Sequence, residues 1–268
     1  MIVLTADNGG PIYFGGSGGA NNFPLKGGKT SNWEGGIRVN GMVFGGAVPE
    51  KMRGKKLDGL GTVWDWYKTF TVGVAGLSEE DVIDRQAQKF DLPAIDSVNL
   101  WPYLTGEVET SPRDSIPIGS TTCSEGYLPN CMSKWGWGEV RTVLGGLIRD
   151  RGDDGLWKLV VDENSMSGFT GPFYPNTSTA HDAFSFNEIE GCGSSGCLYR
   201  LDTDPSETQN LIVSRSDIAN EMLSELVKLN GTNLFSPDRG PGEAVPSIAD
   251  AACDAALNEY GGFWGPFM

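Results

Sequence analysis

Three polar residues near the start of the chain have side chains that could work together in catalysis: Asp7, Asn8 and Lys29. A carboxylate beside an amide carbonyl offers hard oxygen ligands that suit Ca²⁺ or Mg²⁺. Lys29 lies four residues before Trp33-Glu34-Gly35-Gly36 and carries an ammonium group. Taken alone, Asp-Asn-Gly-Gly is also the sequence of an ordinary turn, and a lone lysine is usually a solvated surface residue.

The elements around these residues are expected to place them at the edge of a sheet. The apolar run that begins at Ile2 predicts a strand over Ile2 to Ala6, and a second strand is expected over Ile37 to Phe44. Asp7 and Asn8 would then lie at the carboxyl end of a strand, where open α/β sheets bind ligands. The Gly- and Asn-rich segment from Gly9 to Gly36 predicts a long loop, and structureless loops of that length are commonly functional.

Further along the chain the pattern changes to short strands and one clear helix. A helix is expected over Val63 to Ala75, and an amphipathic helix over Asp217 to Leu229. Val140 to Ile148 and Leu156 to Val161 predict two antiparallel strands joined by an Asp/Gly-rich turn, and Cys197 to Leu201 predicts another strand.

The order and spacing of these motifs resemble the sulfatases, in particular the arylsulfatase B-like branch of the alkaline phosphatase superfamily. The resemblance rests on TADNGG and LKGGKTSNWEGGIRVNGMVF, and it continues through WDWYKTF, NLWPYLTG, SPR, GLWKLV and LYRLDTDPSETQNL to the closing GGFWGPFM. It implies that Asp7 and Asn8 bind Ca²⁺, and that Lys29 is a catalytic residue that binds the sulfate group of the substrate. In sulfate ester hydrolysis, a cation and an ammonium group stabilise charge on the non-bridging oxygens. Glu34 and Arg38 are expected to brace the loop by an exposed ion pair worth ~0–1 kcal/mol.

Several parts of a sulfatase have no counterpart in the chain. Sulfatases use a formylglycine made from Cys or Ser in a Cys/Ser-x-Pro/Ala-x-Arg motif, and none of the five cysteines fits this motif. The paired Asp ligands and the catalytic histidines are also missing. The resemblance therefore implies the C-terminal half alone. Residues 1–110 would complete an alkaline-phosphatase-like α/β sulfatase domain, and residues 111–268 would form a small α+β subdomain with an antiparallel sheet and a helix. Such a chain is expected to be inactive by itself.

The amino-acid composition and net charge disfavour some classes of binding partner. The 268 residues are 39% hydrophobic and 10% aromatic, which is typical of a globular protein. The net charge of −15 disfavours nucleic acid and anionic membranes as partners. A sulfated substrate must then be attracted by local positive charge, from the metal and Lys29. The sequence has no apolar run of about 18 residues that could span a membrane.

Cysteines and sequons indicate an oxidising compartment. N-glycosylation sequons begin at Asn176 and Asn230, and Cys123/Cys131 and Cys192/Cys197 form two close cysteine pairs. We therefore expect a secreted or lysosomal-type location in the lumen of the endomembrane system. The first residues do not have the pattern of a signal peptide, as expected for a fragment. Cys253 is the odd cysteine. It is either a buried free thiol or, as the resemblance implies, the partner of a cysteine in the N-terminal half.

Three functions remain open at this point. The first is a sulfuric ester hydrolase that acts on a sulfate ester, with a sulfated glycan as one candidate, and that needs the missing N-terminal half of the same protein. The second is a non-catalytic, sulfatase-derived fragment that binds sulfated ligands or a partner chain. The third is a phosphoryl- or phosphonyl-transfer relative, which the combination of Asp-Asn-Gly-Gly with Lys-x-x-x-Trp-Glu-Gly-Gly disfavours.

Overall fold

The structure is a computed structural model, and it describes residues 1–12, 20–29, 31–119, 121–123, 141–143, 145–161, 163–165, 167–170, 189–232 and 246–263. The chain divides into two compact units. The first comprises residues 1–120 and 143–235 and carries all three candidate site residues. The second comprises residues 121–142 and 236–268 and contains helix α7 (Pro246–Asn258). The predicted division of the chain at residue 110 stays a prediction.

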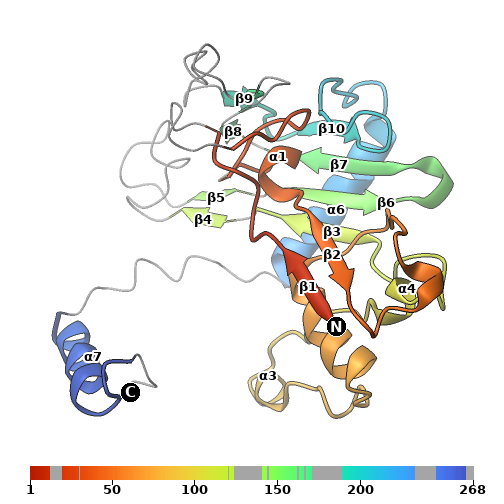
Figure 1. Cartoon of the computed structure of the whole chain (residues 1–268). Coiled ribbons are helices and arrows are strands. Elements are labelled where there is room, and N and C mark those ends of the chain that lie inside the picture. Colours follow the sequence, from red (N-terminus) through yellow and green to blue (C-terminus); the bar gives the residue numbers. More distant parts are fainter. Residues whose placement is uncertain are drawn as a thin grey trace, which may run out of the picture. The chain divides into compact units, whose positions relative to one another are not determined.

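A four-stranded antiparallel sheet is the centre of the first unit (Figure 1). Its strands follow the order β10 (Cys197–Arg200), β7 (Leu156–Val160), β6 (Gly146–Asp150) and β3 (Ser115–Ile118). Strands β6 and β7 form a hairpin in which Leu147 lies opposite Leu159. The short 3-10 helix η4 (Gly152–Asp154) makes the turn. The predicted antiparallel pair and the predicted strand at Cys197 are confirmed.

The single strand predicted over Val140 to Ile148 is wrong in one respect, because the structure has two strands there. Strand β5 (Arg141–Val143) pairs with β4 (Thr121–Cys123), and β6 begins after a break at Gly145. Gly145 has a φ of 72°, and a Cβ there would lie 2.1 Å from the carbonyl oxygen of Ile118. The chain can therefore change direction at this position only with glycine.

Hydrophobic clusters cover both faces of the central sheet. Helix α6 (Ser216–Thr232) confirms the helix predicted at Asp217 to Leu229, and it places Ile218, Met222 and Leu226 on one face of the sheet. These side chains recur every fourth residue, which aligns them along one side of a helix. The opposite face packs against Trp33, which is fully buried. The sheet thus connects helix α6 to the loop that carries the candidate residues.

Strands β1 (Ile2–Thr5) and β2 (Gly41–Phe44) form a separate two-stranded antiparallel sheet, in which Ile2 lies opposite Phe44 (Figure 1). The strand predicted over Ile37 to Phe44 is therefore only half correct. Residues Glu34–Ile37 instead form a short helix, α1. Two consecutive glycines in this helix, Gly35 and Gly36, make close backbone contacts that determine the local structure in place of the apolar pattern.

The helix predicted over Val63 to Ala75 is confirmed, although its turns differ in type. A 3-10 turn, η2 (Val63–Asp65), is followed by an α-helical turn, α2 (Trp66–Lys68), and a π-helical segment, η3 (Thr69–Val74). The remaining elements are η1 (Glu50–Met52), α3 (Arg85–Lys89), α4 (Trp101–Leu104), β8 (Glu163–Ser165) and β9 (Ile189–Gly191). Within the described residues, the structure contains no helix with the length and apolar character needed to cross a bilayer.

The structure settles two of the cysteine predictions. Cys192 and Cys197 form a disulfide, as expected. Cys253 is free and exposed on α7, so the buried-thiol interpretation is wrong. Cys131 and the sequon at Asn176 lie outside the described residues.

Candidate functional site

Two glycine pairs hold the candidate residues together by backbone contacts. The N–H of Gly9 donates a hydrogen bond of 2.8 Å to the carbonyl oxygen of Gly36. The N–H of Lys29 donates one of 3.2 Å to the carbonyl oxygen of Gly10. A Cβ on Gly9 would lie only 1.7 Å from the oxygen of Gly35, so no larger residue fits at this contact. Asp7-Asn8 and Lys29 are therefore brought into one loop cluster.

The side chain of Asn22 stabilises the long loop through hydrogen bonds to its backbone, a role that was not predicted from the sequence. Its side-chain Nδ2 donates to the carbonyl oxygens of Gly10 at 2.9 Å and Gly27 at 3.1 Å. Its Oδ1 accepts from the N–H of Gly10 at 3.2 Å. An asparagine flanked by glycine-rich segments is a recognisable signal for such side-chain bonding to the backbone. The predicted loop is thus held by specific hydrogen bonds where the structure describes it.

The side chains of Asp7 and Asn8 present oxygens at the surface of this cluster. Asp7 is exposed and Asn8 is half-buried. Asp7 Oδ1 accepts from the N–H of Asn8 at 2.9 Å, and Asn8 Nδ2 donates to the carbonyl oxygen of Gly9 at 2.9 Å. These bonds orient Asp7 Oδ2 and Asn8 Oδ1 as the atoms that could bind a cation. Among the residues that the structure describes, no three His, Cys, Asp or Glu side chains are grouped to hold a metal. The donors fit Ca²⁺ in kind, but two of them make only part of the six to eight ligands that it takes.

The two lysines of the loop have different environments. Lys29 is exposed, as a residue that binds a substrate must be before the substrate arrives. Lys26 is instead 94% buried, and its Nζ lies 4.0 Å from the centre of the Trp33 ring and 5.8 Å from that of Tyr199. This is cation–π geometry. Lys26 is therefore a structural residue, and Lys29 is the lysine that remains accessible to a ligand.

A buried cluster of three charged residues includes the first residue of helix α1. Lys158 Nζ lies 3.0 Å from Glu34 Oε1 and 2.7 Å from Glu207 Oε1, and all three side chains are at least 96% buried. Glu207 Oε2 also accepts the N–H of Glu34 at 2.7 Å. Burial raises the pKa of Glu207, while the nearby ammonium of Lys158 acts in the opposite direction. The expected exposed pair of Glu34 with Arg38 exists at 3.7 Å, but Lys158 is the closer and buried partner of Glu34.

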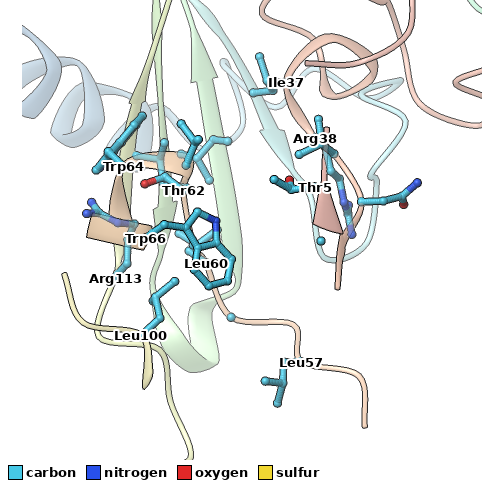
Figure 2. A pocket seen from close by; sticks show the side chains of 18 of the residues that line it. Thr5, Ile37, Arg38, Leu57, Leu60, Thr62, Trp64, Trp66, Leu100 and Arg113 are labelled. Atoms are coloured by element: carbon cyan, nitrogen blue, oxygen red, sulfur yellow. The ribbon is translucent and has the colours of Figure 1, made fainter. Parts of the chain in front are cut away.

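A cleft with a volume of about 1660 Å³ opens beside the candidate residues, and all of its lining belongs to the first unit. Figure 2 shows Thr5 and Arg38 on one wall, and Trp64, Trp66 and Arg113 on the other. Asp7 and Asn8 also line it. The cleft therefore joins the candidate metal ligands to a large, partly apolar surface.

Comparison with known proteins agrees with the motifs. No family model matches the chain. Arylsulfatase J of Mus musculus is 27% identical over 274 aligned residues, which cover 100% of this chain and 39% of that protein. The PsFucS1 sulfatase of Pseudoalteromonas sp. has a similar fold, with a TM-score of 0.51 and 17% identity over 87% of this chain and 38% of the other. This likeness confirms the expected alkaline-phosphatase-like α/β fold class. The chain thus spans about two fifths of the length of these relatives, and it is similar over its whole length to part of an arylsulfatase and in fold to part of a sulfatase.

Proposed function

We propose that this chain carries the Ca²⁺-binding and sulfate-binding part of a sulfuric ester hydrolase. The observation that supports this most is the loop cluster, in which the Gly9–Gly36 and Gly10–Lys29 hydrogen bonds bring two hard oxygen donors close to an exposed lysine. The cluster occurs in a chain that is 27% identical to an arylsulfatase. Neither observation would suffice alone, since an Asp-Asn turn and a surface lysine are both common.

Each residue has a distinct part in the proposed chemistry. Asp7 and Asn8 would hold Ca²⁺ through their side-chain oxygens, with the remaining ligands supplied from outside this chain. The cation, when bound, stabilises negative charge on the non-bridging oxygens of a sulfate ester. Lys29 would contact the sulfate group directly and add a second positive charge. This local positive charge would attract an anionic substrate although the net charge of the chain is −15.

The nucleophile must come from elsewhere, because none of the five cysteines lies in a formylglycine motif. We propose that the missing N-terminal half of the same protein supplies it. Strands β1 and β2 support this, since Ile2, Leu4 and Met42 are more than half exposed although they lie in an apolar two-stranded sheet. The two-stranded sheet and the adjoining cleft offer an apolar surface that a further part of the protein could cover. The sulfated ligand could be a glycan, and the Cys192–Cys197 disulfide supports a secreted or lysosomal-type location in an oxidising lumen.

The first experiment measures binding and turnover by the 268-residue chain. Binding of a chromogenic aryl sulfate is expected to depend on Ca²⁺ and to weaken about tenfold or more in Lys29→Ala, because a charged contact is lost. No hydrolysis is expected. Lys51→Ala is the matched control, since its ammonium bonds the carbonyl oxygen of Gly106, away from the loop cluster.

Each other outcome identifies a different function. Hydrolysis by the chain alone would contradict the proposal that the nucleophile lies outside it. Binding without Ca²⁺ dependence, and equal in both lysine variants, would favour the non-catalytic binding protein that remains the alternative.

A further inference from the structure

Lys158 is a fully buried ammonium group that the proposed chemistry does not use. It lies on β7, on the sheet face that packs against Trp33. Its two carboxylate partners come from distant segments, Glu34 from α1 and Glu207 from the loop that follows β10. One cation therefore joins three parts of the first unit.

The burial of three charges is not by itself evidence that the cluster stabilises the fold. Apolar side chains of similar volume are often as stable as a buried ion pair or more so, because desolvating the charges costs several kcal/mol per ion. The charged cluster instead restricts the relative positions of its three side chains, because an ion pair with hydrogen bonds forms only in a narrow range of geometries. Buried charge is thus suited to holding one segment in a single position.

The segment that the cluster holds is the first residue of α1. Trp33 precedes this helix without donating or accepting a side-chain capping bond. The Glu207 carboxylate, 173 residues away in the sequence, accepts the N–H of Glu34 instead. Glu207 makes this contact from a left-handed backbone conformation, with a φ of 54°, which is uncommon for a residue other than glycine. Lys158 neutralises the same carboxylate and also bonds the side chain of Glu34.

Two backbone hydrogen bonds connect α1 to the loop cluster. The N–H of Gly35 donates to the carbonyl oxygen of Lys26 at 2.7 Å, which fixes the loop that carries Lys29. The carbonyl oxygen of Gly36 accepts from Gly9, which fixes the turn after Asp7 and Asn8. Any rotation of α1 would therefore move the proposed metal ligands relative to the lysine.

We propose that Lys158, together with Glu207, is a positioning residue that sets the spacing between Asp7-Asn8 and Lys29 by fixing α1 against the sheet. The roles of Asp7, Asn8 and Lys29 in this statement rest on the proposed function, but the positioning of the loops does not. Lys158 touches no substrate and acts only through Glu34, Gly35 and Gly36.

Amide hydrogen exchange followed by NMR tests the positioning directly. Lys158→Met alone would leave two buried carboxylates uncompensated, so the variant combines Glu34→Met, Lys158→Met and Glu207→Met and buries no charge. Exchange of the Gly9 and Gly35 amides is expected to accelerate about tenfold or more, while Leu159 in β7 changes by less than about threefold. Ca²⁺ affinity is expected to fall about tenfold, the usual effect of losing a group that orients metal ligands.

A milder variant and a matched control make the result decisive. Glu34→Gln leaves Lys158 paired with Glu207, and it should accelerate exchange at Gly9 and Gly35 by about threefold. The double variant Asp65→Asn with Arg113→Met removes another buried ion pair, with an Nε–Oδ2 distance of 2.6 Å, that does not touch α1. It should leave both glycine amides unchanged.

Unchanged exchange at Gly9 and Gly35 in the folded triple variant, or in Glu34→Gln, would overturn the positioning role. Failure of the proposed function has a different signature. The glycine amides would still respond to the variants, but the wild-type chain would show no response to Ca²⁺.

Discussion

Gly9 and Gly35 are in contact so close that the structure admits no side chain between them. A Cβ on Gly9 would lie 1.7 Å from the oxygen of Gly35. This contact makes two motifs that are separated by some two dozen residues into one structural unit, and it explains why both motifs contain consecutive glycines.

Gly9→Ala should therefore disrupt the loop cluster. We expect a loss of about 1–3 kcal/mol in the free energy of unfolding, because the methyl group forces the two backbones apart. Chemical denaturation of the wild type and the variant measures this. Gly46→Ala is the control, since a Cβ at Gly46 meets nothing within 4 Å. Equal losses in both variants would show that the close contact between Gly9 and Gly35 does not exist.

Substitution of the two loop lysines should change the free energy of unfolding by different amounts. Lys29→Ala should leave the free energy of unfolding within about 0.5 kcal/mol of wild type, because Lys29 is exposed. Lys26→Met should lower it by about 0.5–2 kcal/mol, because the cation–π contact with Trp33 is lost. Thermal and chemical unfolding of both variants test this. A stable Lys26→Met chain beside a destabilised Lys29→Ala chain would reverse our assignment of their roles.

Glu207 should make stability depend on pH in a defined direction. Its pKa in the folded state is raised above the ordinary value of 4.5, mainly by burial. Its contribution to stability is then fully present below pH 4.5 and is lost as the pH rises through the folded-state pKa. In Glu207→Gln this loss is absent. Relative to the variant, wild-type stability should fall with rising pH by at most about 1.4 kcal/mol per unit. Denaturation of both proteins between pH 4 and 7 tests this. A rise of wild-type stability relative to that of Glu207→Gln would contradict the raised pKa of Glu207.

The exposed two-stranded sheet of β1 and β2 should promote self-association of the chain. Leu4 is 53% exposed in a two-stranded sheet with an open edge, which is a typical site for pairing with another chain. Leu4→Lys should reduce association in sedimentation velocity, and Val213→Lys, at an 87% exposed position outside any strand, should not. If both variants associate as the wild type does, the β1–β2 sheet is not the surface responsible.

Local patterns in the sequence predicted the parts of the fold that follow one clear periodicity. Strands β7 and β10 and helix α6 belong to this group. Helix α7 was missed, although its alanine-rich sequence after Pro246 has high helix propensity and a favourable first residue. Ile37 was assigned to a strand from its apolar pattern, whereas backbone contacts of Gly35 and Gly36 place it in α1.

The candidate residues themselves were predicted from motifs, but their support was not. Lys158 is one charged residue in an otherwise apolar strand, and Glu207 lies in a turn-forming segment. Nothing local in either segment indicates that both reach Glu34. Such long-range pairing depends on how the sheet, α1 and the loop after β10 pack together, which only the three-dimensional structure shows.

A Ca²⁺ titration of the chain, followed by the amide NMR signals of Asp7, Asn8 and Lys29, tests the central claim most directly. We predict saturable shifts at these residues, a dissociation constant of about 10⁻⁴ M or weaker because two ligands are few, and loss of the shifts in Asp7→Ala. Absence of any shift at Asp7 and Asn8, or identical shifts in Asp7→Ala, would contradict the proposed metal site.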